Sequence, residues 1–517
     1  MTVEAIRLEN FMAFADTGWI ELKPITLLFG RNSSGKSAII RALRFLRQSL
    51  DEKADSDNGV LKFTAEYGVN LGSYEETIHG GGQYKERIMC FHFRCAIPEA
   101  SDMVRKEINI WRQENNLPSI VAGGQDSLSL AISFARTPSN TAELIGIELS
   151  CNWHILNDQD SQVLLLAQLL DENTRKEVNY DKWWLDTDLP NWFAQDWRFT
   201  TFHFQHNFLP DLQEAPVVVL KQVFNHLAES ISTFLKSIEY LGPIRPDPQR
   251  IYFLDEIGRQ RWRQKGWGAF VDLLEDRLGE TLEDLGKWLK YLKLGKQILS
   301  PINKVAYKDA FIASVEIEEF EEDSNKSSSV YPTLLNMGFG TSQIFPIIVH
   351  AVTLRQRANT EQPVYVVIEQ PELHLHPQAQ ARLADIFIKM LFNNDNNDNT
   401  EARYQIRFLL ETHSEHLMLR FRRRIAETTF DALDPKHPAF PSNEDFHFYK
   451  ENFGLVYLER RDGASMVEYV NVDHRGQMVD PSTEFRIFFD DDYKEVEFLA
   501  DAKMAILNIE YGNTHSS

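Results

Sequence analysis

The sequence predicts an α/β fold in which buried parallel strands alternate with helices, with a large mixed α+β insertion and a small β-rich cap at the C-terminal end. Residues 24 to 29 form an apolar run that leads into a glycine-rich loop and an amphipathic helical pattern. Residues 364 to 368 and 405 to 411 are nearly continuous apolar runs, as strands buried on both faces are. Each of these runs is followed by a helical pattern, which is the order expected in a parallel sheet.

The composition is that of a packed globular protein of two or three domains, with 517 residues and 43% hydrophobic residues. A net charge of -22 disfavours a surface that binds nucleic acid everywhere but allows focal basic patches. Three cysteines without CxxC spacing favour a reducing cytosol and disfavour a zinc site or a disulfide framework. Because there is no leader and no run of 18 apolar residues, we expect a cytoplasmic protein that makes no membrane contact.

We expect five segments along the chain. They are an N-terminal lobe (1–57), a tryptophan-rich insertion (58–237), linker helices and strands (238–330), a C-terminal lobe (331–440) and the β-rich cap (441–517). Within the insertion, the pattern predicts strands at 88–95 and 145–156 and helices at 161–178 and 215–237. Its tryptophans indicate a compact subdomain core with an exposed aromatic patch, and a dedicated partner surface is the alternative. Polar loops are expected at 318–329 and 393–400.

The loop from Gly30 to Ser37 fits the pattern G-x-x-x-x-G-K-S between a predicted strand and a predicted helix. Its backbone N–H groups can surround phosphate oxygens at the N-terminus of the helix. Lys36 would reach the β and γ phosphates, and the hydroxyl of Ser37 would bind Mg²⁺. The loop therefore predicts a site for ATP, whose contacts are Gly30, Arg31, Asn32, Ser33, Ser34, Gly35, Lys36, Ser37 and Ala38.

The strand "VYVVIE" ends at Glu369, a carboxylate that we expect to hold Mg²⁺ together with Ser37. Most ATPases of this kind have a glutamate at the next position, which takes a proton from the attacking water. Here it is Gln370, whose amide can orient water but cannot accept that proton. Glu372 is the candidate substitute base. Because loss of a general base costs about 10² to 10⁴ in rate, we expect nucleotide binding with slow or conditional turnover.

Residues 336 to 349 predict a glycine-flanked helix whose N-terminus is free to meet a phosphate. Pro346 is tolerated only in the first turns, so the helix should begin near Ser342. The candidate contacts are Gly338, Gly340, Thr341, Ser342 and Gln343. Since the chain's own loop already supplies one helix N-terminus, the second should meet the γ-phosphate held by another copy. This predicts a homodimer or a higher homo-oligomer.

Residues 408 to 425 predict a strand that ends at Glu411 and a helix that begins near Ser414. His413 lies between them, where it could sense the γ-phosphate and position water. The arginines of the helix have two interpretations, a solvated face or a focal phosphate or nucleic-acid contact. They are Arg420, Arg422, Arg423 and Arg424.

The segment "HLHP" places Pro377 at a helix N1 position, where its missing N–H costs little. His374 and His376 could bind a metal at this spacing. A capping or dimer-contact role is favoured, because no third ligand is in sight.

The order of these elements, together with "IRLENFMAF" at residues 6 to 14, resembles the ABC-type P-loop ATPase heads of the SMC and RecF group. It resembles more closely the bacterial ATPases related to OLD nucleases and Septu-type defence ATPases. The resemblance covers roughly residues 1–50, 238–255 and 330–490. It implies that residues 338–343 are the ABC signature, Glu369 the magnesium carboxylate and His413 the switch histidine. Gln370 and His376 depart from the wider ABC pattern.

This resemblance implies an ATP-binding subunit of an antiphage defence complex, which dimerises around ATP and controls a partner nuclease of the HNH type. A retron-type RNA or DNA would be a further focal partner. The alternative is a DNA-repair ATPase of the SMC or RecF kind, which would need long heptad arms that the pattern lacks. A self-contained OLD-like nuclease is disfavoured because no Glu-Gly pair occurs in the chain to begin a Toprim metal site. The acidic residues Asp490, Asp491 and Asp492 lack that companion.

Overall fold

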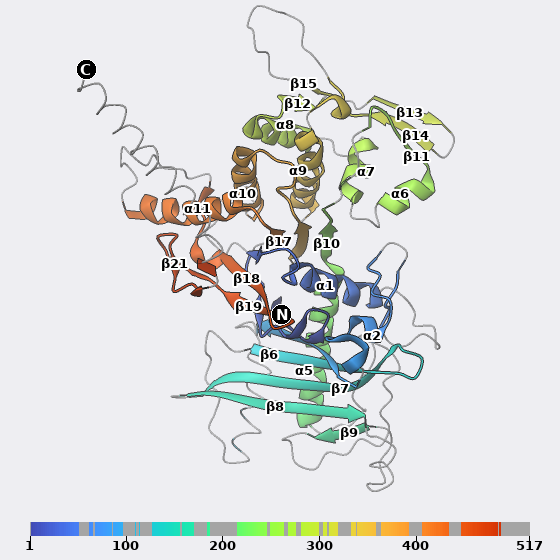
Figure 1. Ribbon diagram of the computed structural model, residues 1–517, viewed down its shortest axis with the longest axis vertical. Helices are drawn as coiled ribbons and strands as arrows, with labels where there is room; N and C mark the ends of the chain where they lie inside the picture. Colours follow the sequence, from blue (N-terminus) through green and yellow to red (C-terminus); the bar gives the residue numbers. More distant parts are fainter. Residues whose placement is uncertain are drawn as a thin grey trace, which may run out of the picture.

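In the computed structural model, two sheets are stacked along the long axis of the molecule, and helices cover the upper one (Figure 1). The structure describes residues 2–50, 61–96, 127–169, 183–186, 215–262, 267–275, 281–298, 303–318, 332–357, 363–391, 406–433 and 446–486, with the isolated positions 109 and 113 and without the short internal gaps 66–67, 85, 156–157, 244, 246–248, 308–309, 338 and 484. The segments predicted as polar loops lie almost entirely outside these residues, and so do Asp490, Asp491 and Asp492.

The central sheet has six strands in the order β10-β16-β17-β4-β18-β19. These strands are β10 (Ile238–Leu241), β16 (Val364–Glu369), β17 (Ile406–Thr412), β4 (Ile25–Gly30), β18 (Phe453–Arg461) and β19 (Ala464–Tyr469). All neighbours pair in parallel except β18 and β19, which form a hairpin. The parallel strands predicted from the apolar runs are therefore confirmed, and β17 lies between β16 and β4.

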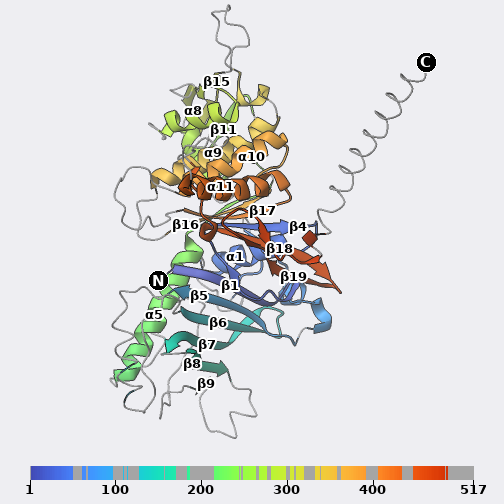
Figure 2. The ribbon, with the colours of Figure 1, turned by 90° about the vertical axis from the view of Figure 1, so that its left-hand side faces the viewer.

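Helices cover both faces of the central sheet (Figures 1 and 2). α1 (Lys36–Leu50) and α5 (Ala215–Lys236) lie on one face, and α9 (Phe339–Arg357), α10 (Pro377–Leu391) and α11 (Glu415–Leu433) on the other. Successive strand residues point to opposite faces. Val367 and Leu409 accordingly join the core around α1, whereas Val366 and Leu410 join the core around α9 to α11. This burial on both faces explains the continuous apolar runs.

The insertion extends a second, antiparallel sheet that begins with the first strand of the chain. Its order is β2-β1-β5-β6-β7-β8-β9, and β3 also pairs with β1. The strands are β1 (Thr2–Phe11), β2 (Phe14–Asp16), β3 (Ile20–Glu21), β5 (Met89–Ala96), β6 (Ser127–Arg136), β7 (Ala142–Ile155), β8 (Asp158–Leu169) and β9 (Trp183–Asp186). Strands predicted at 88–95 and 145–156 correspond to β5 and β7.

The helix predicted at 161–178 is wrong over residues 161–169. These residues belong to β8, which pairs with β7 along its whole length. The apolar run from Val163 to Ala167 is compatible with either a helix or a strand, and pairing with a long neighbouring strand decides between them. Residues 170–178 lie outside the described residues. The helix predicted at 215–237 is confirmed as α5.

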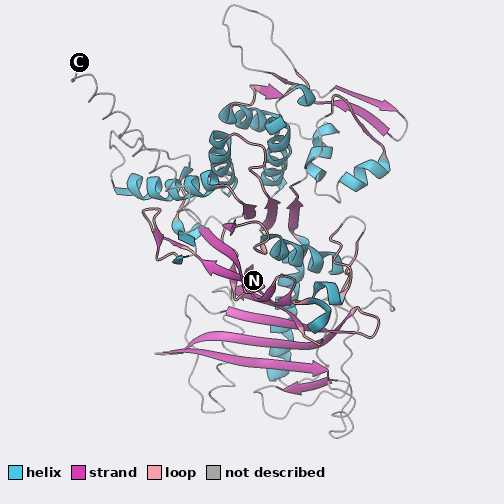
Figure 3. Ribbon diagram, in the orientation of Figure 1, coloured by secondary structure: helices cyan, strands magenta, loops and turns pink. Residues whose placement is uncertain are grey.

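A group of short elements lies beyond the helices at one end of the molecule (Figure 3). It contains α6 (Glu256–Trp262), α7 (Gly268–Leu274), α8 (Thr281–Leu292), β11 (Tyr252–Leu254), β12 (Gln297–Ile298), β13 (Asn303–Tyr307), β14 (Ala310–Ser314) and β15 (Ile317–Glu318). Small elements elsewhere are α2 (Tyr74–Thr77), β20 (Asn471–Val472), β21 (Met478–Val479) and the 3-10 turns Gly81–Tyr84, Leu334–Asn336 and Lys450–Asn452. Trp262 stacks on Phe270 there, with ring centroids 5.9 Å apart.

One further expectation needs correction. The α9 helix begins at Phe339, three residues before the predicted start, so Pro346 lies inside it. Since Pro346 has no N–H for the carbonyl four residues earlier, one hydrogen bond is missing from the helix ladder there. The hairpin expected in the C-terminal cap is confirmed as β18 and β19, and it continues the central sheet through β4. None of the helices in the described part of the chain combines the length and apolar character needed to cross a membrane.

Candidate nucleotide-binding site

The ends of three parallel strands meet at one edge of the central sheet. β4 ends at Gly30, and α1 begins at Lys36 after the glycine-rich loop. In the sheet register, Glu411 of β17 lies opposite Glu369 of β16 on one side and Leu28 of β4 on the other. Ligands of open α/β sheets bind at such carboxyl ends. The phosphate loop and two carboxylates are therefore brought together by strand order.

Two loop positions require glycine. Gly30 and Gly35 have φ values of 149° and 99°, which side chains rarely adopt. A Cβ atom at Gly30 would lie 2.2 Å from the carbonyl oxygen of Leu458 in β18, and one at Gly35 would lie 2.8 Å from the hydroxyl oxygen of Ser465 in β19. The β18–β19 hairpin therefore packs directly against the phosphate loop and forms part of its support.

Lys36 reaches back across its own loop. Its Nζ atom donates hydrogen bonds to the carbonyl oxygens of Gly30, at 2.8 Å, and Arg31, at 2.7 Å. The side chain is buried, and burial lowers the pKa of the ammonium group to about 8 even though Glu411 and Glu372 oppose the shift. The loop thus holds a cation at its mouth, as the sequence pattern predicts.

Ser37 contacts a carboxylate that the sequence analysis did not single out. Its hydroxyl group donates to Glu411, with the two carboxylate oxygens at 2.9 and 3.0 Å. Burial and the neighbouring charge of Glu369 raise the pKa of Glu411 to about 7. The signal available in the sequence was the position of Glu411 at the end of an apolar strand. Its meaning depends on the lateral order of the strands, which places β17 next to β4.

Glu369 is held on the other side of the site. The hydroxyl group of Tyr240 in β10 donates to its Oε1 atom at 2.7 Å, and the guanidinium of Arg44 lies over the Tyr240 ring at 3.6 Å from its centroid. Burial and the Glu369 charge raise the pKa of Tyr240, which keeps its hydroxyl protonated as a donor. Ser37 donates to Glu411, whereas Glu369 accepts from Tyr240.

The residues fit a magnesium ion. Glu369, Glu372 and Glu411 lie close enough for Glu369 and Glu372 to raise the Glu411 pKa, so negative charge is crowded at a buried position. Mg²⁺ prefers carboxylate and hydroxyl oxygens, and it binds through one or two carboxylates together with substrate phosphates. Ser37 with Glu411, and Glu369 beside them, provide that set of atoms.

Gln370 has a left-handed backbone with a φ of 46°, which is uncommon for a residue with a side chain. Its N–H group donates to the carbonyl oxygen of Glu411 at 2.7 Å. The buried guanidinium of Arg245 donates to the carbonyl oxygens of Gln370, at 2.8 Å, and Glu369, at 3.1 Å. These contacts fix the main chain at the position of the missing general base. The sequence analysis did not identify Arg245 as part of the site.

Glu372 and His413 are linked through the main chain. Glu372 is buried, and its Oε1 atom accepts the backbone N–H of His413 at 2.8 Å. Burial raises the pKa of Glu372. Burial and the charge of Lys36 lower the pKa of His413, whose ring has a backbone hydrogen bond with Gly30. His413 therefore lies beside the phosphate loop in its neutral form, and Glu372 orders the segment that carries it.

The start of α9 is largely packed within the molecule. Ser342 and Gln343 are buried, with 1% and 4% of their surface exposed, whereas Gly340 and Thr341 are partly exposed. A Cβ atom at Gly340 would lie 2.7 Å from the carbonyl oxygen of His374. Gly338 lies outside the described residues. Of the predicted contacts that the structure describes, Gly340 and Thr341 are the ones that the single chain leaves accessible.

The main chain of His376 has a local structural role. α10 begins at Pro377, as predicted, and the carbonyl oxygen of His376 accepts N–H groups of Ala379, at 2.8 Å, and Gln380, at 3.1 Å. His374 has a left-handed backbone with a φ of 63°. His376 thus occupies the capping position of α10, in agreement with the capping interpretation.

The arginines of α11 are engaged inside the molecule. Arg424 donates to Asp385 of α10 at 2.7 Å and Arg420 at 2.6 Å, and Asp385 is fully buried. Arg422 donates to the carbonyl oxygen of Gly476, and Arg423 pairs with Glu427. The solvated-face interpretation is therefore wrong for Arg420 and Arg424, whose charge is paired with Asp385, whereas Arg423 lies on the exposed side of the helix.

The fold and this site define a P-loop ATPase head of mixed α/β type. The model of the AAA ATPase domain family matches residues 1–241 and 269–418, which is more than half of the chain. The chain therefore belongs to the AAA ATPase domain family, and membership implies ATP binding. A comparison with curated proteins finds no match.

Solved structures with a similar fold include SMC heads. One is the SMC head domain from Thermotoga maritima, with 10% identity, a TM-score of 0.34 and coverage of 91% of this chain and 100% of that one. A second is an Smc head bound to the C-winged helix domain of ScpA, with 11% identity, a TM-score of 0.38 and coverage of 92% of this chain and 98% of that one. A third is an Smc head domain with an extended coiled coil bound to the C-terminal domain of ScpA derived from Pyrococcus furiosus. It has 10% identity, a TM-score of 0.34 and coverage of 91% of this chain and 96% of that one. The likeness is distant and concerns the fold.

Glu411→Gln is expected to raise the free energy of unfolding of the nucleotide-free protein at pH 8. Below about pH 5, the variant and the wild type should have equal free energies of unfolding. The pKa of Glu411 is raised from 4.5 to about 7, so the folded state binds the extra proton between these values and loses stability as the pH rises through them. Above pH 7 the variant should gain on the order of 2 kcal/mol in free energy of unfolding. Urea unfolding at pH 5 and pH 8 measures the difference. A variant less stable than the wild type at pH 8 would contradict the assigned crowding of carboxylates.

Proposed function

We propose that the chain is the ATP-binding subunit of a bacterial antiphage complex, which dimerises around ATP and in that state controls a partner nuclease. The observation that carries the proposal is the combination of a lysine in the phosphate loop, Lys36, and a hydroxyl–carboxylate pair suited to Mg²⁺, Ser37 and Glu411, with an amide at position 370. Such a site can bind a triphosphate firmly but lacks the carboxylate that speeds its hydrolysis. A long-lived bound state is suited to a switch.

Each residue has a definite task in this scheme. Lys36 exchanges the carbonyl oxygens of Gly30 and Arg31 for phosphate oxygens, which are stronger acceptors because they are charged. Bound Mg²⁺ would be held by Ser37 with Glu411 or Glu369 and would neutralise phosphate charge. His413, neutral and beside Gly30, can donate to the terminal phosphate. Gln370 can orient the attacking water but cannot take its proton.

The second phosphate contact would come from another copy of the chain. Gly340 and Thr341 are partly exposed at the start of α9, and backbone N–H groups at a helix start favour anions. Two copies in opposite orientation would then enclose two nucleotides, and each nucleotide would join both copies. Opening and closing of this dimer would report the nucleotide state to the effector.

The nuclease partner is supported by the resemblance to Septu-type ATPases, which are paired with an HNH nuclease. In the described part of the insertion, strands β5 to β9 form a sheet and the longest helix, α5, has 22 residues, in contrast to the long coiled-coil arms of a chromosome-structuring protein. Co-purification of the tagged chain from its native operon with ATP tests the partner. Recovery of a nuclease is the expected result, and any retron-type RNA or DNA would be recovered in the same fraction. DNA degradation by the purified chain alone would contradict the proposal.

Gln370→Glu is expected to raise the rate of ATP hydrolysis at least about tenfold, because it restores a carboxylate where a general base acts. The main chain at this position is fixed by Arg245 and Glu411, so the new side chain should begin from the same backbone. Steady-state phosphate release at saturating ATP measures the effect. Gln370→Met, which removes the water-orienting amide, is the control, and its rate of ATP hydrolysis should be lower than that of the wild type. An unchanged rate in Gln370→Glu would show that position 370 does not limit turnover.

A further inference from the structure

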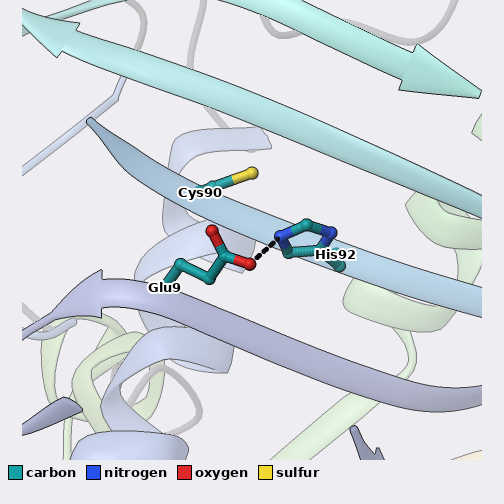
Figure 4. Close-up of side chains that lie close together, drawn as sticks. All are labelled: Glu9, Cys90 and His92. Atoms are coloured by element: carbon teal, nitrogen blue, oxygen red, sulfur yellow. Dashed lines mark ion pairs between the residues drawn. The ribbon is translucent and has the colours of Figure 1, made fainter. Parts of the chain in front are cut away.

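A second group of metal-binding side chains lies away from the nucleotide site, on the antiparallel sheet. Glu9 of β1 and Cys90 of β5 are direct partners in the strand register. His92 is two residues further along β5, so it projects from the same face as Cys90. Figure 4 shows the three side chains close together on one face of these two strands. Rigid strands position such ligands more accurately than loops do.

The distances between the three side chains suit the binding of a single metal ion. The carboxylate oxygen, the sulfur and the imidazole nitrogen all lie within 4.8 Å of one another. The Nε2 atom of His92 is 3.2 Å from Oε1 of Glu9, as the dashed line in Figure 4 marks. This buried nitrogen makes no hydrogen bond of acceptable geometry with any residue in the described part of the chain. In the neutral tautomer that carries its proton on Nδ1, the Nε2 lone pair is available to a cation placed between the imidazole and the carboxylate.

The donor set identifies the type of metal. One sulfur, one imidazole nitrogen and one carboxylate oxygen are the ligands that Zn²⁺ takes, at about 2.0 to 2.3 Å. A tetrahedron with such bonds has ligand atoms about 3.3 to 3.8 Å apart, so small side-chain rotations would complete it. Three protein ligands leave a fourth position for water. Mg²⁺ and Ca²⁺ prefer oxygen ligands alone and are excluded by the same argument.

Neighbouring residues hold two of the ligands in place. The hydroxyl group of Ser133 in β6 donates to the sulfur of Cys90 at 3.3 Å. The Trp19 ring packs edge-on against the His92 ring, with centroids 6.0 Å apart. Such contacts orient ligands at metal sites and are part of their design.

Arg7 competes for Glu9. Its Nη2 atom is 2.6 Å from Oε1 of Glu9, and a metal would have to displace this cation. Arg7 also donates two hydrogen bonds to Asp16, at 2.9 and 2.7 Å. It therefore keeps a bidentate carboxylate partner when Glu9 turns to a metal. Asp16 thus allows Arg7 to release Glu9 to a metal ion and still keep a carboxylate partner.

We propose that Glu9, Cys90 and His92 form a Zn²⁺ site that ties the first strand of the ATPase head to the sheet of the insertion. This site is separate from the nucleotide site and takes a different class of metal. It runs against the expectation from cysteine spacing, because its ligands come from two strands about 80 residues apart in sequence, which a CxxC search cannot detect.

The test uses two cysteines of one strand. Cys95 lies five residues after Cys90 in β5 and is fully buried on the core side of the sheet, so Cys95→Ala is a matched control for Cys90→Ala. Protein purified without chelator and held in excess Mg²⁺ and ATP, which occupy the other site, should carry one zinc per chain by elemental analysis. Co²⁺ added to the stripped protein should give the visible bands of a tetrahedral site and a thiolate-to-cobalt band in the near ultraviolet.

Cys90→Ala should lose the zinc and the thiolate-to-cobalt band, and Cys95→Ala should keep both. Glu9→Gln, which is nearly isosteric, should lower zinc affinity at least about tenfold and serves if Cys90→Ala does not fold. Equal zinc content in Cys90→Ala and Cys95→Ala, wild-type zinc affinity in Glu9→Gln, or no zinc and no cobalt bands in the wild type would overturn the proposal.

Discussion

Lys36→Met is expected to weaken the binding of MgATP at least about a hundredfold. The substitution keeps the apolar stem and removes the ammonium group, which donates two hydrogen bonds inside the loop and would donate to phosphate oxygens instead. Hydrogen bonds to charged groups contribute about 1.5 to 3 kcal/mol each, so two of them account for a factor of about 10² to 10⁴. Titration calorimetry of the purified variant with MgATP measures this loss.

The same lysine should make the ATP affinity of the wild type depend on pH. Because burial lowers the pKa of Lys36 to about 8, the nucleotide-free protein loses this charge as the pH rises through 8. ATP affinity should therefore decrease above pH 8, by up to about tenfold per unit, and be steady below it. Lys287→Met, on an exposed helix face, is the control and should bind like the wild type. A Lys36→Met affinity within threefold of the wild type would refute the assignment of the loop.

Asp385→Ala is expected to reduce the free energy of unfolding by about 3 to 5 kcal/mol, the largest stability effect foreseen for a single side chain of this protein. Asp385 is fully buried and accepts hydrogen bonds from Arg420, Arg424 and Tyr291. Removing it leaves two guanidinium groups without their buried carboxylate. Urea unfolding at neutral pH, with a change in midpoint at constant slope, measures the effect.

The pH dependence of this network has the opposite sign to that of Glu411. Burial acts to raise the pKa of Asp385, but hydrogen bonds from Arg424 and Arg420 outweigh it and hold the pKa below its ordinary value. The stabilisation is thus complete at neutral pH and is lost as the pH falls through the lowered value. Asp284→Ala, which breaks an exposed pair with Lys287, should cost less than about 1 kcal/mol. A similar small cost for Asp385→Ala would show that the pair is not stabilising.

The features that could be predicted from the sequence are those specified by a short run of contiguous residues. The phosphate loop, the strand ends at Glu369 and Glu411 and the capping position at His376 each depend on a short stretch, and the structure has loop, strands and cap at those residues. Pro377 begins its helix as predicted because its fixed φ and missing N–H suit a first turn.

The parts that sequence reasoning missed depend on lateral packing. Nothing local shows that β17 lies between β16 and β4, and this order is why Ser37 contacts Glu411. The partner of Arg424 is on another helix 39 residues away. Likewise, the run Val163 to Ala167 becomes a strand because β7 lies beside it, and the β18–β19 hairpin joins the central sheet because β4 has an open edge there. Periodicity specifies neither of these neighbours.

The central claim is that ATP joins two copies of the chain through the start of α9. Light-scattering mass during size-exclusion chromatography tests it most directly, with and without saturating MgATP, for the wild type and for Thr341→Arg, which places a long side chain at a partly exposed position of that helix start. We predict that the wild-type mass rises from the 59.9 kDa of one chain to twice that value with ATP, and that Thr341→Arg binds ATP but stays at the mass of one chain. A wild type that binds ATP and keeps the mass of a single chain, or a Thr341→Arg variant that doubles its mass equally well, would contradict the account.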